Sequence, residues 1–271
     1  RKGVIEQTKR HAFICSLLGI KQVVLAINKM DLIGYDESVF HQIHADFQSF
    51  TSQLKFSTIT PIPISALKGD NVVNRSPHMS WFRGPTLMAI LETAPIPNLA
   101  NDHGLRFPVQ WVNRPHLNFR GFAGTIAVGT VKLGDEVRVL PSGAKAKVAE
   151  IILFEQSLDQ AQCGQAVTLT LDKEIDASRG DMIVSAQDPC EVSDQFEVDL
   201  VWMTEEQGFI GRSYGMQIGS NWVNAQITEI KHKTNVNTLQ TSPTRSLELN
   251  DIVVAKLSLD KPVAYELYQQ C

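Results

Sequence analysis

The pattern of secondary structure predicted along this chain of 271 residues changes once, near residue 93, and that change limits the fold more than any other feature. Before it, apolar residues recur at the spacing of amphipathic helices, between two short and continuously apolar runs. Helices are predicted at 5–18, 38–54 and 85–92, the last with Pro85 in its first turn, and strands at 21–28 and 58–65. This alternation is typical of a parallel α/β layer. Pro61 and Pro63 place the second strand near a sheet edge, because proline donates no hydrogen bond to a neighbouring strand.

After a linker at 93–103, rich in Pro, Asn and Asp, the chain is predicted to form only short strands separated by turns. They are predicted at 106–113, 121–131, 135–140, 145–154, 166–171 and 182–185 and, beyond a second break at 188–193, at 195–203, 213–218, 221–233 and 251–259. Closely spaced strands without intervening helices favour closed antiparallel barrels. We therefore expect a multidomain fold, α/β followed by all-β. It comprises an α/β domain at 1–94, a β-barrel at 104–190 and a second barrel at 192–271 that need not be complete.

Composition and charge argue against two classes of partner. The net charge of −4 and the pI near 6.0 provide no basic surface, so nucleic-acid binding is not expected. No apolar run approaches the roughly 18–20 residues of a membrane span, so no membrane contact is expected either. Cys15, Cys163, Cys190 and Cys271 lack CxxC or Cys/His spacing, which predicts free thiols in a reducing cytoplasm.

The sharpest motif is Asn28-Lys29-Met30-Asp31, directly after the first predicted strand. Guanine presents two donors, N1–H and N2–H, which one carboxylate such as that of Asp31 can accept together, and adenine has no such pair. The Asn28 side chain can bond N7, and the methylene stem of Lys29 can lie along the purine face. Such tetrapeptides also occur by chance. The position at the carboxyl end of a strand, where open α/β sheets bind ligands, favours the guanine interpretation.

A second short motif, Ser65-Ala66-Leu67, ends the next predicted strand, one helix further along the chain. The N–H of Ala66 is expected to meet guanine O6, because only small side chains let the backbone come that close. Ser-Ala-Leu alone carries little information. Two such motifs at the ends of successive strands, in this order, indicate a guanine pocket.

Residues that would bind phosphates or magnesium are not found. The sequence has no GxxxxGK[ST] loop and no Gly-Lys dipeptide. Residues 31–34 match DxxG, but they overlap the guanine motif and are rejected as a γ-phosphate contact. We therefore assign no catalytic residue and no metal ligand. His41 and His44, near Asp46, are expected to be solvated, and the segment 113–122 is equally consistent with a partner-docking loop and with a solvated hairpin.

The chain resembles GTPases of the translation-factor type, in which a nucleotide-binding domain precedes two β-barrels, as in elongation factor Tu. Within that superfamily it is similar to the large, GTP-binding subunits of bacterial sulfate adenylyltransferases. The stretches that carry the resemblance are 3–11, 16–21, 26–32, 65–73, 84–87, 107–110 and 120–125. The resemblance implies that the P-loop α/β domain is present only in its C-terminal part, because the phosphate loop and switch regions of the family precede residue 1. It also implies that more barrel sequence follows Cys271.

The resemblance also implies ligands and partners. Guanine-binding positions carry over to Asn28, Lys29, Asp31, Ser65, Ala66 and Leu67. The cofactor of the family is GTP or GDP with Mg²⁺, whose phosphate and metal ligands have no counterparts in this chain. A small catalytic subunit would form adenosine 5′-phosphosulfate from ATP and sulfate, driven by GTP hydrolysis on the large subunit. Two alternatives remain: an elongation-factor-like GTPase that binds RNA, and a GTPase-derived scaffold without activity.

Overall fold

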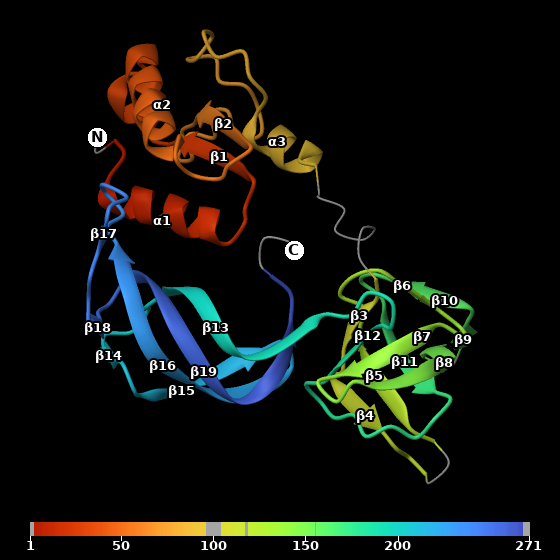
Figure 1. Ribbon diagram of the computed structural model, residues 1–271. Helices are drawn as coiled ribbons and strands as arrows, with labels where there is room; N and C mark the ends of the chain where they lie inside the picture. The colour runs from red at the N-terminus through yellow and green to blue at the C-terminus, as the bar shows by residue number, and fades with distance from the viewer. Residues whose placement is uncertain (1–2, 96–103, 117–118, 155, 268–271) are drawn as a thin grey trace. The chain divides into compact units, whose positions relative to one another are not determined.

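The computed structural model describes residues 3–95, 104–116, 119–154 and 156–267 (Figure 1). The chain divides into two compact units, residues 1–96 with 234–242 and residues 97–233 with 243–271. Most of the predicted linker at 93–103 lies outside the described residues. The three-domain boundaries drawn from the sequence stay a prediction.

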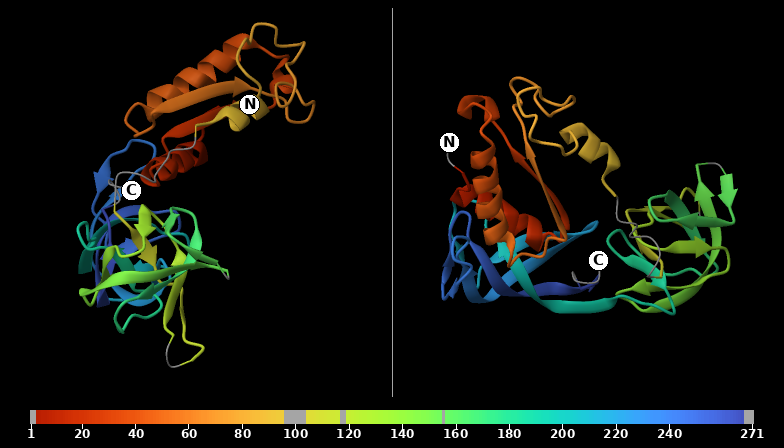
Figure 2. Two further views of the ribbon diagram at one scale, coloured as in Figure 1. Left: turned by 90° about the vertical axis from the view of Figure 1, so that its right-hand side faces the viewer. Right: turned by 90° about the horizontal axis from the view of Figure 1, so that it is seen from above.

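The first unit contains the predicted alternation of helices and strands. Its elements are α1 (Glu6–Leu17), β1 (Gln22–Ile27), a 3-10 helix η1 (Met30–Ile33), α2 (Glu37–Thr51), β2 (Thr58–Pro63) and α3 (Leu87–Thr93). Strands β1 and β2 are parallel, in a register that runs from Gln22 opposite Thr58 to Ile27 opposite Pro63. Helices α1 and α2 lie beside each other, since Lys9 of α1 lies over the ring of Phe50 of α2, 5.5 Å from its centroid (Figure 1 and Figure 2). The parallel α/β layer is thus confirmed.

Local sequence explains how these elements begin and end. The carboxylate of Asp36 accepts hydrogen bonds from the N–H groups of Ser38 and Val39 and so caps α2. The hydroxyl of Thr86 caps α3 in the same way, so Pro85 precedes the cap and the prediction that it lies in the first turn was wrong. Among the described residues, β2 pairs only with β1, as its two prolines led us to expect.

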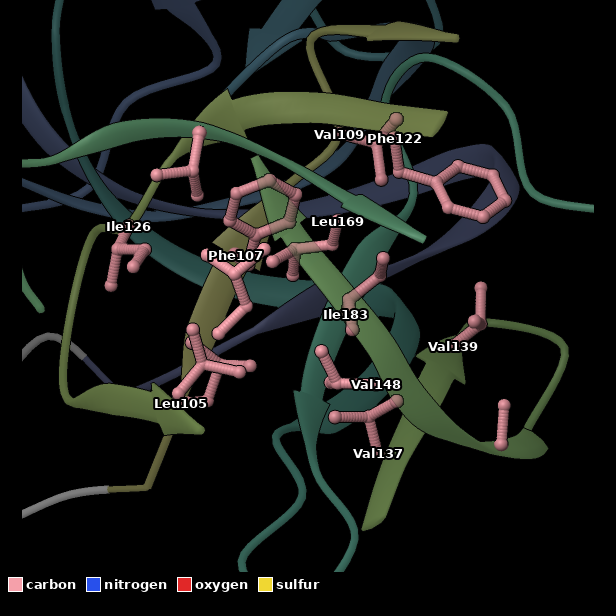
Figure 3. Close-up of a cluster of buried hydrophobic side chains, with 14 of the residues drawn as sticks. Leu105, Phe107, Val109, Phe122, Ile126, Val137, Val139, Val148, Leu169 and Ile183 are labelled. Carbon is pink, nitrogen blue, oxygen red and sulfur yellow. The ribbon is translucent and has the colours of Figure 1, made fainter. Parts of the chain in front are cut away.

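Ten strands build the first antiparallel sheet system of the second unit. They are β3 (Arg106–Pro108), β4 (Trp111–Asn113), β5 (Gly121–Thr125), β6 (Thr130–Lys132), β7 (Glu136–Leu140), β8 (Ala144–Leu153), β9 (Gln156–Leu158), β10 (Gln160–Gln162), β11 (Ala166–Leu171) and β12 (Met182–Ser185). The strand order is β3-β12-β7-β8-β11-β5-β4. Because its two ends, β3 and β4, follow each other in the chain, the sheet closes on itself. Phe107, Phe122, Leu169 and Ile183 fill the interior (Figure 3).

Two strands predicted as continuous are each split in two. The segment 106–113 bends at Val109 and Gln110, so that β3 pairs with β12 while β4 pairs with β5. The segment 121–131 turns away after β5, and β6 pairs with β10 instead. Both errors have one cause. A bend at a barrel corner is set by which strands lie beside it, and a run of apolar residues does not encode that.

A second antiparallel sheet follows. Its strands are β13 (Glu191–Val201), β15 (Ser213–Ile218), β16 (Asn221–Thr234) and β19 (Ile252–Tyr265), in the order β13-β19-β16-β15, and the short strand β17 (Thr241–Ser242) pairs with β16. The short strands β14 (Gly208–Phe209) and β18 (Ser246–Leu247) pair with each other in a separate sheet. Its core contains Ile227, Leu247 and Val253. The predicted strands are present, and β19 runs six residues beyond the predicted end at 259. The architecture is therefore an α/β domain with β-barrel-like domains.

A buried arginine ties three segments of the second unit together. The side chain of Arg106 is only 5% exposed. It donates to the carbonyl oxygen of Asp188 at 2.7 Å and forms ion pairs with the carboxylates of Asp188 and Glu266. The Arg106 guanidinium therefore links strand β3 to the segment before β13 and to the end of β19. No helix in the described part of the chain is long and apolar enough to cross a membrane.

Candidate guanine site

The two predicted guanine motifs lie side by side where β1 and β2 end. The N–H of Ile64 donates to the carbonyl oxygen of Ile27 at 2.9 Å, and the N–H of Met30 donates to that of Ile64 at 3.2 Å. Parallel pairing therefore continues past both strands into the loops. It brings residues 28–31, here called the guanine loop, against residues 65–67, here called the serine loop.

Asn28 joins the two loops. Its side-chain oxygen accepts the N–H of Lys29 at 2.6 Å and the N–H of Ala66 at 3.0 Å. The Ala66 N–H that the sequence assigned to guanine O6 thus donates to Asn28 in this structure. The Asn28 amide nitrogen has no hydrogen-bond partner among the described residues, and the side chain is exposed. It remains a free donor at the rim of the site.

Asp31 is oriented by the serine loop. The hydroxyl of Ser65 donates to Asp31 Oδ1 at 2.7 Å, and Ser65 is fully buried. The same hydroxyl oxygen accepts the N–H of Lys68 at 3.2 Å, which fixes the direction of its proton. Asp31 Oδ2 has no partner among the residues that the structure describes. The carboxylate is therefore held at one oxygen and open at the other.

The remaining two predicted positions are at the surface of the loops. Lys29 adopts a left-handed backbone conformation, with φ of 68°, and its side chain is exposed. Leu67 is 83% exposed. Both side chains are accessible to a flat ligand.

Sequence reasoning missed a group of residues behind the loops. The phenol of Tyr35 donates to Asp70 Oδ2 at 3.0 Å, and the indole N–H of Trp81 donates to the carbonyl oxygen of Tyr35 at 3.2 Å. Burial, together with Asp70, raises the pKa of Tyr35 above its usual value. Asn71 is buried and donates to the carbonyl oxygen of Pro63 at 2.9 Å. The resemblance over 65–73 includes Asp70 and Asn71 but gave no role to either, and it does not include Tyr35 or Trp81.

Other candidates from the sequence do not join this site. His41 lies 3.4 Å from Glu37 on an exposed face of α2. Within the described ranges, no three His, Cys, Asp or Glu side chains are grouped closely enough to hold a metal ion. In the segment 113–122, Arg114 pairs with Glu174 at 2.9 Å and Arg120 with Asp176 at 3.2 Å, beside a shallow pocket of about 320 Å³.

Two known families match parts of the chain. Residues 1–133 match the family described as elongation factor Tu GTP binding domain. Residues 195–271 match the family described as GTP-eEF1A C-terminal domain-like. Solved structures with a similar fold include sup35 complexed with GMPPNP, at 22% identity and a TM-score of 0.57 over 97% of this chain and 68% of that one. Elongation factor SelB from Methanococcus maripaludis, in its apo form, gives 21% identity and a TM-score of 0.52 over 98% of this chain and 57% of that one.

Curated relatives are more similar in sequence. Sulfate adenylyltransferase subunit 1 from Cellvibrio japonicus is 50% identical over 270 residues, which is 100% of this chain and 57% of the relative. The proteins of the same name from Saccharophagus degradans and Citrobacter koseri are 48% and 45% identical, over 99% and 100% of this chain and again 57% of each relative. The chain spans little more than half the length of these relatives. It belongs to the sulfate adenylyltransferase subunit 1 family, within the GTP-binding proteins of the elongation factor Tu type.

Proposed function

We propose that this chain is the guanine-recognising and barrel-containing part of the GTP-binding subunit of a sulfate adenylyltransferase. One observation carries the proposal for guanine. The Asp31 carboxylate is held by Ser65 at one oxygen and is open at the other, at the point where two parallel strands end. Ligands bind at the carboxyl ends of strands in open α/β sheets.

The Asp31 carboxylate discriminates between purines through its acceptor character. Each carboxylate oxygen has two lone pairs, so Oδ1 can accept a guanine donor while it still accepts the Ser65 hydroxyl. Guanine supplies N1–H and N2–H to the pair of oxygens. Adenine presents the lone pair of its N1 nitrogen at the position of guanine N1–H. This lone pair is repelled by the negatively charged carboxylate and donates no hydrogen bond. Hydrogen bonds to a charged group contribute about 1.5–3 kcal/mol each, so this one residue can supply most of the preference for guanine.

The neighbouring side chains complete the base pocket. The free amide nitrogen of Asn28 is a donor for guanine N7, while its oxygen keeps the two loops together. The exposed stem of Lys29 and the exposed side chain of Leu67 are apolar surfaces for the flat base. Five of the six positions assigned from the sequence thus have a role toward guanine in this proposal. The sixth, Ala66, donates its N–H to Asn28 instead.

The chain offers less for the phosphates and the metal than for the base. When bound, a magnesium–GTP complex supplies the free energy of γ-phosphate hydrolysis to the enzyme. The sequence has no GxxxxGK[ST] loop, and the described residues hold no group of metal-binding side chains. The residues present therefore fit the base and do not fit the metal, and no hydrolytic step is assigned to them. Base recognition alone predicts weak binding, on the order of 1 mM.

The name shared by the relatives supports a role in sulfate activation. Formation of adenosine 5′-phosphosulfate from ATP and sulfate is unfavourable, so a subunit that hydrolyses GTP can drive it. Such coupling requires that the GTP and GDP states differ in their contacts with the catalytic subunit. In this proposal the partner is the small catalytic subunit, and the β-barrel-like domains are the part of this chain that contacts it.

Ligand-observed NMR with GMP and AMP tests the base-binding part. We expect saturable binding of GMP, at least tenfold weaker binding of AMP, as for the loss of one charge-assisted hydrogen bond of about 1.4 kcal/mol or more, and no preference in Asp31→Ala. Asp46→Ala is the matched control, because Asp46 lies on α2 and, among the residues that the structure describes, accepts a hydrogen bond from Gln42 alone. Equal binding of GMP and AMP by the native chain would overturn the proposal for guanine.

Co-purification with the small subunit tests the partner. We expect a stable complex whose formation does not require RNA. Tight binding of aminoacyl-tRNA to the chain, with no complex, would instead favour the elongation-factor-like alternative. Loss of both interactions would favour a scaffold without this activity.

A further inference from the structure

Tyr35 has an unusual backbone conformation for a large residue. Its φ is 60°, in the left-handed region, and it directly follows Gly34, whose φ is 67°. Bulky residues rarely adopt this conformation, and they keep it only where surrounding contacts enforce it. The turn that contains it, 28–35, includes the whole guanine loop. Its geometry therefore bears on where the Asp31 carboxylate points.

Four contacts hold Tyr35 in place. Its N–H donates to the carbonyl oxygen of Met30 at 2.9 Å, and its own carbonyl oxygen accepts the indole N–H of Trp81 at 3.2 Å. Its ring stacks on His78, with ring centroids 4.8 Å apart and planes at 18°. Its hydroxyl donates to Asp70 at 3.0 Å. Backbone, ring and hydroxyl are thus all engaged, and Met30 and Tyr35 bracket Asp31.

Asp70 connects this turn to the serine loop. It is 8% exposed, and its backbone pairs with that of Ser65 in both directions, at 3.2 and 3.1 Å. One of its carboxylate oxygens accepts the hydroxyl of Ser76 at 2.7 Å, and the other accepts that of Tyr35. The residue that fixes Ser65 by its backbone therefore fixes Tyr35 by its side chain.

We propose that Tyr35 and Asp70 are positioning residues for guanine recognition, which set the Asp31 carboxylate relative to Ser65 so that both of its oxygens face the base. This inference rests on the proposed guanine site. Neither residue touches the base. Without the Tyr35 hydroxyl, the turn loses its side-chain bond to Asp70. The side-chain hydrogen bonds of Asn28 and Asp31 then remain between the turn and the serine loop. The Asp31 carboxylate is then held by one hydrogen bond, from Ser65, and its orientation is less restricted.

Inosine diphosphate is the probe that separates positioning from simple stability. Its base lacks the 2-amino group of guanine and can give only one of the two hydrogen bonds to Asp31. The ratio of dissociation constants for IDP and GDP therefore reports how well the second carboxylate oxygen is aimed. The phosphates are the same in both ligands and cancel in the ratio. A residue that only stabilises the fold changes the thermal midpoint and leaves this ratio unchanged.

The test compares Tyr35→Phe with a matched removal of a hydroxyl elsewhere. The hydroxyl of Tyr265 donates to the carboxylate of Glu191 at 2.6 Å, in the other compact unit, so Tyr265→Phe removes the same kind of bond. In the full chain, we expect Tyr35→Phe to reduce the IDP/GDP ratio by roughly threefold to tenfold, mainly through weaker GDP binding. The ratio in Tyr265→Phe stays at the native value. Asp70→Asn keeps a single acceptor oxygen, and we expect it also to reduce the IDP/GDP ratio.

An unchanged IDP/GDP ratio in Tyr35→Phe, with or without a lower thermal midpoint, would overturn the positioning role and leave the guanine site intact. A native chain that binds IDP and GDP equally, or whose preference survives Asp31→Ala, would overturn the guanine site itself and the positioning role with it. The two failures are therefore distinguished by the native chain and the Asp31 variant alone.

Discussion

The side-chain oxygen of Asn28 accepts the backbone N–H of Ala66 at 3.0 Å, across 38 positions of sequence. The same oxygen accepts the N–H of Lys29 at 2.6 Å. One amide thus closes the guanine loop on itself and fastens it to the serine loop. Because the oxygen is used for this, only the amide nitrogen is left to contact a base. These bonds within the chain hold the two loops together, and such preorganisation lowers the entropy cost of binding a ligand.

Asp31→Asn is expected to change which purine is preferred. The substitution replaces two acceptors by one acceptor and one N–H₂ donor, while the acceptor oxygen keeps its bond from Ser65. Guanine presents donors to both positions, and xanthine presents a donor at N1–H and an acceptor at O2. We expect GMP binding to weaken by roughly tenfold to a hundredfold, and XMP to bind more tightly than GMP, in ligand-observed NMR titrations. A variant that still prefers GMP would contradict the assigned role of Asp31.

How far the sequence predicts this site depends on whether the signal is local. Asp31 and Ser65 were identified because each follows a strand, and parallel strands end at the same edge of a sheet. Tyr35 and Asp70 were not identified, because their contact joins two loops and the positive φ of Tyr35 has no sequence signature. The same limit explains the strand predicted at 106–113. Residues 106–113 alone do not show where the chain bends, and the bend at Val109 appears only when both neighbouring strands are known.

The cap of α2 is expected to make stability depend on pH in a defined direction. Hydrogen bonds from the Ser38 hydroxyl and then the Ser38 N–H hold the pKa of Asp36 below its usual 3.8. A carboxylate with a lowered pKa in the folded state adds stability above the unfolded-state pKa, and loses it as pH falls through the folded-state pKa. Asp36→Ala should therefore lower the urea midpoint at pH 7, and the gap to the native chain should narrow below about pH 4.

Asp36→Asn provides the control for this prediction. An asparagine caps a helix but does not titrate in this range, so the gap between Asp36→Asn and Asp36→Ala should stay constant with pH. A native-to-alanine gap that widens on acidification would show that the carboxylate does not act as this cap.

Cys190 is expected to be chemically inert in the folded chain. It is 8% exposed, and burial raises the pKa of its thiol to about 12, against the opposing effect of Arg106. At pH 8 the reactive thiolate is then a very small fraction of the total. Titration with a chromogenic disulfide should give the same number of fast-reacting thiols for the native chain and for Cys190→Ser. In denaturant the variant should give one fewer. Loss of one fast-reacting thiol under native conditions would disprove the burial.

The closing corner of the first barrel depends on a residue without a side chain. A Cβ added to Gly124, on β5, would lie 2.3 Å from the carbonyl oxygen of Pro108, on β3. Because that oxygen belongs to the backbone, it cannot move away by a side-chain rotation. Gly124→Ala must therefore push the two strands apart. Overpacking of this kind costs about 1–3 kcal/mol. We expect a loss of this size in the free energy of unfolding, measured in urea.

Gly215→Ala is the matched comparison, because Gly215 also lies in a strand, β15. A Cβ there would meet only the ring of Trp222, at 3.7 Å, which is ordinary contact. Alanine restricts the unfolded chain more than glycine does, so we expect this variant to be neutral or more stable by up to about 1 kcal/mol. The difference between the two variants isolates the contact with Pro108 from the general effect of adding a methyl group. If both lose the same stability, the close approach of β3 and β5 is not what requires glycine at 124.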